Sequence, residues 1–101
     1  MDRSSTAVLV AVTYTTDNLM QEVATETNTT VYCAIDSVTG TEFAQAGQLG
    51  VKPEYRLTMF RYDYNGEQIV ILGQTRYKVY RTYQPRKGDD IELYLERSTG
   101  P

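Results

Sequence analysis

The sequence predicts a mostly β protein, a small six-stranded antiparallel β-barrel with a short inserted helix. Short runs of β-branched and aromatic residues recur along the chain and are separated by Gly, Pro and Asn turns. A single segment, residues 39–49, has helical spacing instead. Six strands with one short helix favour a closed or nearly closed barrel. The 101 residues fit a single domain spanning 1–101, with flexible tails expected at 1–6 and 98–101.

Two strands separated by a polar segment are expected before the helix. Ala7–Tyr14 is rich in β-branched residues and predicts the first strand. Thr15–Thr30 is polar without a helical stripe, which predicts either a long loop or the tip of an extended hairpin. Thr30–Asp36 predicts the second strand, because apolar residues recur at every second position, 31, 33 and 35.

The helix is expected from Thr41 to Gln48. Thr39 is spaced to cap it, and Glu42 can complete a capping box. Apolar side chains at positions 43, 46 and 49 fall at helical spacing. The simplest expectation is that Phe43 and Leu49 pin a short helix over one end of the barrel.

Four strands are expected after the helix, at Tyr55–Asp63, Gln68–Leu72, Arg76–Tyr83 and Ile91–Glu96. The Asn-Gly pair at 65–66 is a strong hairpin-turn signal, so the four are predicted to form an antiparallel meander. Alternation predicts that positions 91, 93 and 95 point inward, and that positions 77, 79, 81 and 83 share one face of their strand.

The composition argues against an enzyme. Without histidine the commonest general base is absent, and no Ser-His-Asp or Cys-His arrangement can form. Cys33 is the single cysteine, which excludes an internal disulfide and a thiolate metal cluster. Cys33 alternates with core positions and is expected to be a buried, inert thiol. We therefore expect no catalytic residues, no metal and no cofactor.

The net charge of −3 disfavours general binding to nucleic acid. Residues 1–54 have a net charge of −5 and residues 55–101 one of +2, an asymmetry that can orient subunits in an assembly. The longest apolar run, Ala7–Val12, is too short for a membrane span, so a soluble protein is expected.

Tyrosine is abundant, with nine residues placed mostly on predicted strands. Tyrosine suits interfaces because it combines apolar area with a polar group. Tyr80 and Tyr94 are candidates for an aromatic interface. The neighbouring bases at 76, 78 and 81 leave open a platform for single-stranded nucleic acid.

Two stretches together carry a family resemblance. The first is Ser37–Gly47, which runs on to Gly50–Tyr55, and the second is Tyr77–Tyr83 followed by Asp89–Leu95. Over residues 13–97 the chain resembles the head–tail joining proteins of long-tailed bacteriophages and their prophages, also called head-closure or stopper proteins. Asp2-Arg3-Ser4-Ser5 is less basic than the usual opening of that family.

The resemblance implies a structural virion protein. It implies a ring of identical subunits, expected to be a dodecamer, beneath the portal and its adaptor protein. Such a ring closes the DNA channel and presents a docking surface for the tail terminator or tail tube protein. DNA is blocked or passed without recognition of its sequence. The protein is expected at the head–tail interface of the virion, and in the host cytoplasm during assembly.

Family members hold DNA back with a loop that projects into the channel, and two segments are candidates. One is the polar 15–29 segment, with Asp17, Asn18, Gln21, Glu22 and Glu26. The other is the 38–53 insertion, which is also a candidate contact with a neighbouring subunit or the adaptor, with Thr41, Glu42, Phe43, Gln45, Gln48, Leu49 and Lys52.

Two other functions stay open. One is another tail component, such as a tail terminator, on a related barrel. The other is a monomeric small-barrel module that binds nucleic acid or oligosaccharide.

Overall fold

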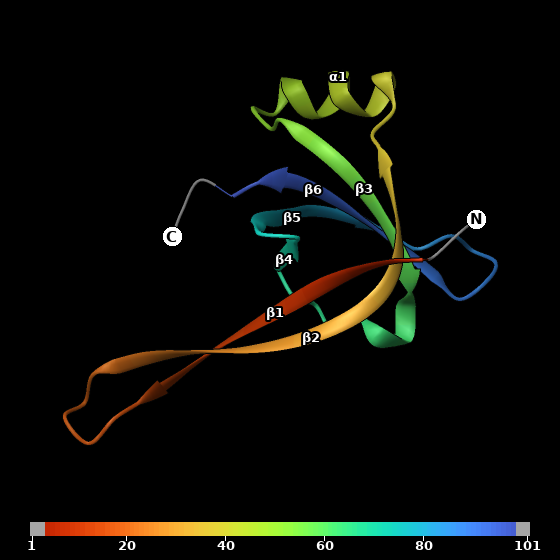
Figure 1. Ribbon diagram of the computed structural model, residues 1–101. Helices are drawn as coiled ribbons and strands as arrows, with labels where there is room; N and C mark the ends of the chain where they lie inside the picture. Colours follow the sequence, from red (N-terminus) through yellow and green to blue (C-terminus); the bar gives the residue numbers. More distant parts are fainter. Residues whose placement is uncertain (1–3, 99–101) are drawn as a thin grey trace.

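The chain folds into a closed six-stranded antiparallel barrel in the computed structural model, which describes residues 4–98 (Figure 1). Around the barrel the strands follow the order β1-β2-β3-β6-β5-β4, and β4 pairs with β1 to close it. The elements are β1 (Ser5–Thr16), β2 (Glu22–Ser37), α1 (Gly40–Gln48), β3 (Pro53–Phe60), a 3₁₀ turn (Arg61–Asp63), β4 (Ile69–Leu72), β5 (Thr75–Tyr83) and β6 (Asp90–Arg97). The predicted fold class is confirmed.

The barrel interior is filled by side chains that alternate along the strands. On β6, Ile91, Leu93 and Leu95 are 3%, 0% and 0% exposed, as the alternation predicted. They meet a core cluster that draws on all six strands and includes Leu9, Cys33, Leu57, Met59, Val70 and Val79. Alternating apolar residues thus bury one face of each strand in a common core.

The predicted meander of the last four strands is wrong. β3 pairs with β2 and β6 and makes no ladder with β4; only β4, β5 and β6 are consecutive neighbours. β3 ends at Phe60, and residues 61–68 leave the sheet through the 3₁₀ turn and a loop. Gly66 has a φ of 84° in that loop, so Asn65-Gly66 turns the chain without forming a hairpin. β4 is then free to pair with β1 and close the barrel.

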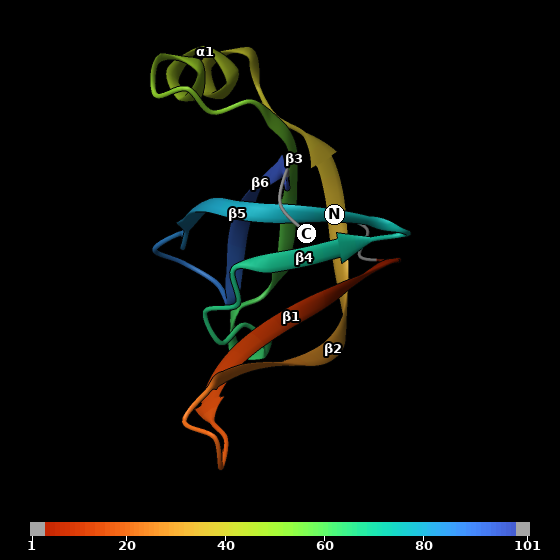
Figure 2. The same cartoon turned by 90° about the vertical axis from the view of Figure 1, so that its left-hand side faces the viewer.

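Polar residues 15–30 form an extended hairpin, the second of the two predicted alternatives. β1 and β2 pair without interruption from Ser5↔Cys33 to Thr16↔Glu22. The hairpin projects from the lower end of the barrel, while α1 lies at the upper end (Figures 1 and 2). This arrangement gives the molecule an elongated shape, with extents of 49 × 30 × 27 Å.

Two further expectations need correction. Ser5 and Thr6 are paired in β1, so the expected tail over residues 1–6 is wrong for these two; residues 1–3 and 99–101 lie outside the described residues. On β5, the register shifts between Val79 and Arg81. The resulting bulge puts Arg81 on the outer face, opposite Tyr94, and breaks the predicted shared face of positions 77–83.

Candidate interaction surfaces

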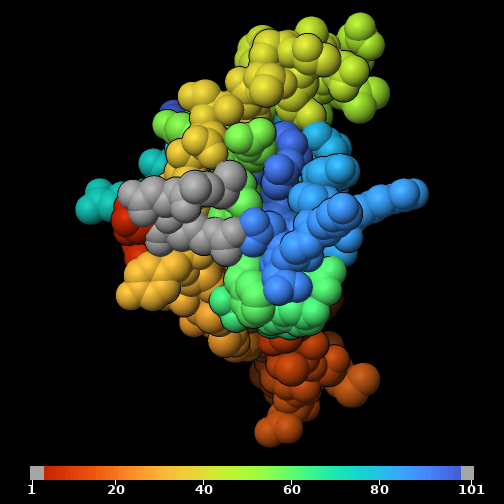
Figure 3. Space-filling model, turned by 90° about the vertical axis from the view of Figure 1, so that its right-hand side faces the viewer, coloured from red at the N-terminus to blue at the C-terminus, as the bar shows by residue number. Residues whose placement is uncertain are grey.

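The first surface is the projecting hairpin of residues 11–30, which we call the arm. Every residue from Thr13 to Thr30 is exposed, so neither face of this stretch is buried against the barrel, although Glu26 is ion-paired with Arg76 of β5. The predicted channel residues all lie on it and are all exposed: Asp17, Asn18, Gln21, Glu22 and Glu26. Figure 3 shows the arm protruding beyond the rest of the molecule. Most of the arm is therefore available to a partner.

Asp17 organises the tip of the arm. Its carboxylate accepts hydrogen bonds from the backbone N–H of Leu19 at 2.8 Å and of Gln21 at 2.9 Å. Met20 adopts a φ of 62°, a left-handed conformation that is uncommon outside glycine. Leu19 and Met20 are left 76% and 85% exposed by this turn. The tip thus presents two apolar side chains on a defined turn.

The two faces of the arm differ in charge. One face pairs Val12 with Glu26, Tyr14 with Ala24, and Thr16 with Glu22. The other face is neutral and rich in threonine, with the pairs at 11 and 27, 13 and 25, and 15 and 23. No Lys or Arg occurs between Arg3 and Lys52, so the arm has no basic side chain.

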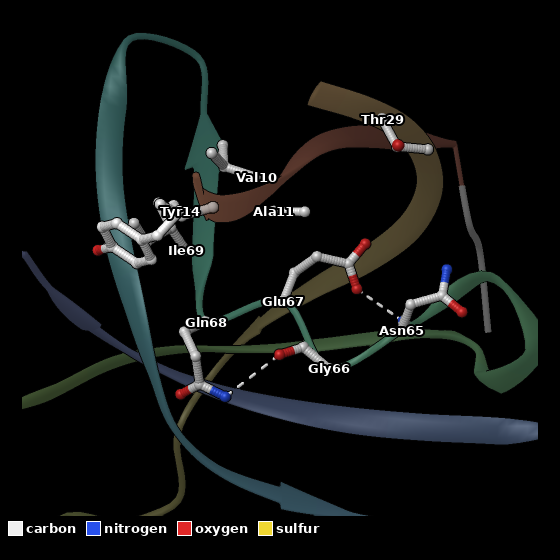
Figure 4. Close-up of a pocket in the computed structure, with 10 residues that line it drawn as sticks. Val10, Ala11, Tyr14, Thr29, Asn65, Gly66, Glu67, Gln68 and Ile69 are labelled. Atoms are coloured by element: carbon white, nitrogen blue, oxygen red, sulfur yellow. Dashed lines mark hydrogen bonds between the residues drawn. The ribbon is translucent and has the colours of Figure 1, made fainter. Parts of the chain in front are cut away.

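A hollow of about 560 Å³ lies where the arm leaves the barrel (Figure 4). It is lined by β1, by Thr29 and by the loop from Asn65 to Ile69. Glu67, 7% exposed, accepts a hydrogen bond from the Asn65 backbone N–H at 2.6 Å. The Tyr64 hydroxyl donates to the Glu67 carbonyl at 2.7 Å, and burial together with the Glu67 charge raises the Tyr64 pKa. Glu67 is the one carboxylate in the lining, and its hydrogen bond from Asn65 lies within the 65–69 loop.

The second surface is helix α1 with its flanking residues. The predicted cap is confirmed: Thr39 Oγ1 accepts from the Glu42 N–H at 3.2 Å. Phe43 and Leu49, however, are 54% and 83% exposed, and only Ala46 of the helix is buried. The expectation that Phe43 and Leu49 pin the helix is therefore wrong. The other predicted residues of this segment are also exposed, except for half-buried Glu42: Thr41, Gln45, Gln48 and Lys52.

Polar contacts of Glu42 attach the helix to the barrel. Its carboxylate accepts from the Tyr80 hydroxyl at 2.9 Å and forms a hydrogen-bonded ion pair with Arg81. Arg81 in turn stacks over the Tyr94 ring, 4.0 Å from its centroid. We call Glu42, Tyr80, Arg81 and Tyr94 the clamp. The Glu42 carboxylate of the predicted capping box is thus directed to the barrel instead of back to its own helix.

The clamp perturbs the ionisation of its members. Burial opposes ionisation of Glu42, but the hydrogen bonds from Arg81 and Tyr80 and the charge of Arg81 outweigh it and lower the Glu42 pKa. Burial, the hydrogen bond to Glu42 and the Glu42 charge raise the Tyr80 pKa. Glu42 therefore stays ionised and bonded at neutral pH.

Tyr94, a predicted interface residue, is 8% exposed and its hydroxyl donates to Glu92 at 2.7 Å. Its ring lies 6.3 Å from that of half-buried Tyr80. The two tyrosines thus serve packing within the subunit. The exposed apolar groups that the predictions missed include Tyr14, Leu19 and Met20 on the arm and Tyr32 on β2. Leu19-Met20, an apolar pair inside a polar segment, was the available signal.

Of the three basic residues in the possible nucleic-acid platform on β5, Lys78 is exposed and the other two are ion-paired. Arg76 is ion-paired with Glu26 at 3.0 Å, and Arg81 is held by Glu42. A platform for single strands needs basic side chains that are free to meet phosphates. These contacts therefore weigh against that alternative.

Within residues 4–98, no three Cys, Asp or Glu side chains gather as potential metal ligands. The same part of the chain has no helix with the length and apolarity needed to cross a membrane. Comparison of the sequence with protein-family models and with curated proteins gives no match.

Proposed function

We propose that the chain is a structural subunit of the head–tail connector of a long-tailed phage. In this function it forms a ring beneath the portal and adaptor, closes the DNA channel and offers a docking surface to the tail. The observation that carries the proposal is the arm: an exposed, ordered hairpin without basic residues on a closed barrel. The proposal also draws on the sequence resemblance over residues 13–97.

The charge of the arm suits a channel that must let DNA slide. Lys and Arg side chains bind phosphates strongly and would hold the duplex in place. The arm instead has three acids, Asp17, Glu22 and Glu26, and otherwise neutral residues. Such a segment can obstruct a channel sterically and release the duplex when it moves. This supports the arm as the part that closes the channel.

Helix α1 suits a separate task. It lies at the end of the molecule opposite the arm, and its exposed Phe43 and Leu49 leave apolar area without a partner (Figures 1 and 3). The clamp fixes the helix to the barrel at one side, which presents the remaining sides to a neighbour. We assign α1 to contact with the adaptor, the tail or the next subunit.

Two shortened variants separate these tasks. In the first, residues 13–25 are replaced by Asn-Gly, which joins the paired residues Val12 and Glu26 by a two-residue turn. All the removed residues are exposed, so the barrel should fold. Phage with this variant should assemble heads that lose packaged DNA. Asn18→Ser, which keeps the arm, is the matched control and should give normal titre.

In the second variant, residues 44–50 are replaced by a Gly-Ser link. The clamp residue Glu42 is kept, and only Ala46 of the removed segment is buried. Heads should keep their DNA but fail to join tails. Full infectious titre with both folded variants would contradict the proposed function. Labelling the protein in particles then separates a connector subunit at the head–tail joint from a tail terminator further along the tail.

A further inference from the structure

The arm has two open sheet edges. β1 pairs with β4 only from Val8 to Val10, and β2 pairs with β3 only from Cys33 to Ser37. Beyond those ladders, the outer edge of β1 over residues 11–16 and that of β2 over residues 22–32 have no strand beside them. Elsewhere in the barrel only short stretches have a single neighbour, such as residues 5–7 of β1 and 80–83 of β5. The longest open edges therefore lie on the arm.

These edges have few of the features that normally prevent strand addition. Natural edge strands are blocked by charged side chains, above all Lys, and by Pro, bulges or short length. The charged residues on the two strands of the arm are Glu22 and Glu26. The arm has neither Pro nor Lys, its ladder has no register shift, and it is rich in Thr and Val, which favour strands. An isolated two-stranded hairpin is also only marginally stable in water. A third strand alongside would satisfy its backbone groups and stabilise it.

We propose that the arms of neighbouring copies join edge to edge, with the β1 edge of one copy against the β2 edge of the next. This inference rests on the proposed ring. When neighbouring arms point the same way, β2 of one copy runs antiparallel to β1 of the next, as within each arm. The contact is head-to-tail and leaves a new open edge at each end of the growing sheet. Copies can therefore continue to add until a ring closes and no open edge remains.

Charge favours this pairing over a two-fold contact between two β2 edges. The charged residues on the β2 edge are Glu22 and Glu26. Antiparallel pairing of two β2 edges centred on Ala24 would put Glu22 opposite Glu26, and centring on Glu26 would put two copies of Glu26 face to face. Like charges directly across a ladder are destabilising. Against a β1 edge, the same glutamates meet neutral Val12, Tyr14 and Thr16.

The joined arms would form a continuous sheet with one partly acidic face and one neutral, Thr-rich face. Neither face has a basic side chain, so either could line a DNA channel without holding phosphates.

Cysteine cross-linking tests the pairing in pure protein, without phage particles. One variant has Thr13→Cys on β1, and two others have Thr25→Cys or Thr27→Cys on β2. All three positions lie on the same face of the arm. Each variant is oxidised alone and in a mixture, at high protein concentration. The native thiol Cys33 is fully buried, so the unmodified chain is the background control.

We expect disulfide-linked dimers to form in the mixtures of a β1 variant with a β2 variant, well above the level of either variant alone. Dimers from Thr25→Cys alone at the same level would overturn the proposal in favour of a two-fold contact. Absence of a mixed product would also overturn it. As a second measurement, backbone amide exchange in residues 11–16 and 22–32 should slow with rising concentration, while exchange in α1 stays unchanged. An unchanged rate in both edges would count against the pairing.

The outcome is separable from that of the proposed function. Mixed cross-links in a protein that is absent from virions would support edge pairing and refute the connector function. A protein found at the head–tail joint that gives no mixed cross-link would keep the connector function and refute edge pairing.

Discussion

Breaking the clamp by Glu42→Gln should destabilise the attachment of helix α1 to the barrel. The substitution keeps the shape of the side chain and removes its charge. Glu42 is the most enclosed member of its ion pair, with a side chain 12% exposed, while that of Arg81 is 43% exposed. Loss of the charge weakens both the bond from Arg81 and the bond from the Tyr80 hydroxyl at 2.9 Å.

The exposed fractions of the Glu42 and Arg81 side chains set the expected loss in free energy of unfolding. Hydrogen bonds to charged groups contribute about 1.5–3 kcal/mol when well buried, whereas exposed ion pairs contribute about 0.2–1 kcal/mol. Since Arg81 is screened by solvent, we expect Glu42→Gln to lower the free energy of unfolding by about 1 kcal/mol. A double-mutant cycle with Arg81→Met should give a coupling energy of the same order, because the two side chains are in direct contact.

Denaturant unfolding followed by circular dichroism measures these changes. Glu54→Gln is the matched control, because Glu54 pairs with Arg97 at 3.3 Å and the Arg97 side chain is 63% exposed. The control should unfold much as the unmodified chain does. If the control is destabilised as much as Glu42→Gln, or if the cycle gives no coupling between Glu42 and Arg81, the assignment of the clamp is wrong.

Three further predictions concern the core, the thiol and acid stability. Leu93→Ala, at a fully buried site, should lower the free energy of unfolding by about 2–5 kcal/mol, while exposed Lys78→Ala should change it little; equal effects in denaturant would contradict the inward assignment. Burial raises the pKa of the Cys33 thiol, so a thiol reagent should modify it only at the rate of unfolding, and fast labelling of the native protein would show an open barrel. Because the Glu42 pKa is lowered in the folded chain, its contribution is complete above the ordinary glutamate pKa and is lost as the pH falls through the folded value. Unfolding of Glu42→Gln should therefore depend less on pH in the acidic range, and an identical pH dependence would refute this.

The sequence by itself determined which face of the regular strands is buried. Side chains in a strand alternate with a period of two, so the run from Ile91 to Leu95 specified its inward face wherever its neighbours lie. The helix start was equally local, because Thr39 lies three residues before the N–H that it accepts. Both features can be predicted from the pattern of residues close in sequence.

The tertiary structure alone decided which strands are neighbours and whether residues 15–30 form a loop or a hairpin. The pairing of β3 with β6 joins residues thirty or more positions apart in sequence, and no local pattern distinguishes it from a meander. Residues 15–30 show no apolar alternation because both faces meet solvent, so strand and loop could not be told apart from the sequence.

The partners of Glu42 could not be predicted from the sequence either. Tyr80 and Arg81 lie 38 and 39 residues further along the chain, and the bulge after Val79 changes which face they occupy. A pattern with a period of two cannot anticipate an inserted residue. Local periodicity therefore specified the core, whereas the clamp and the open edges of the arm follow from how the barrel closes.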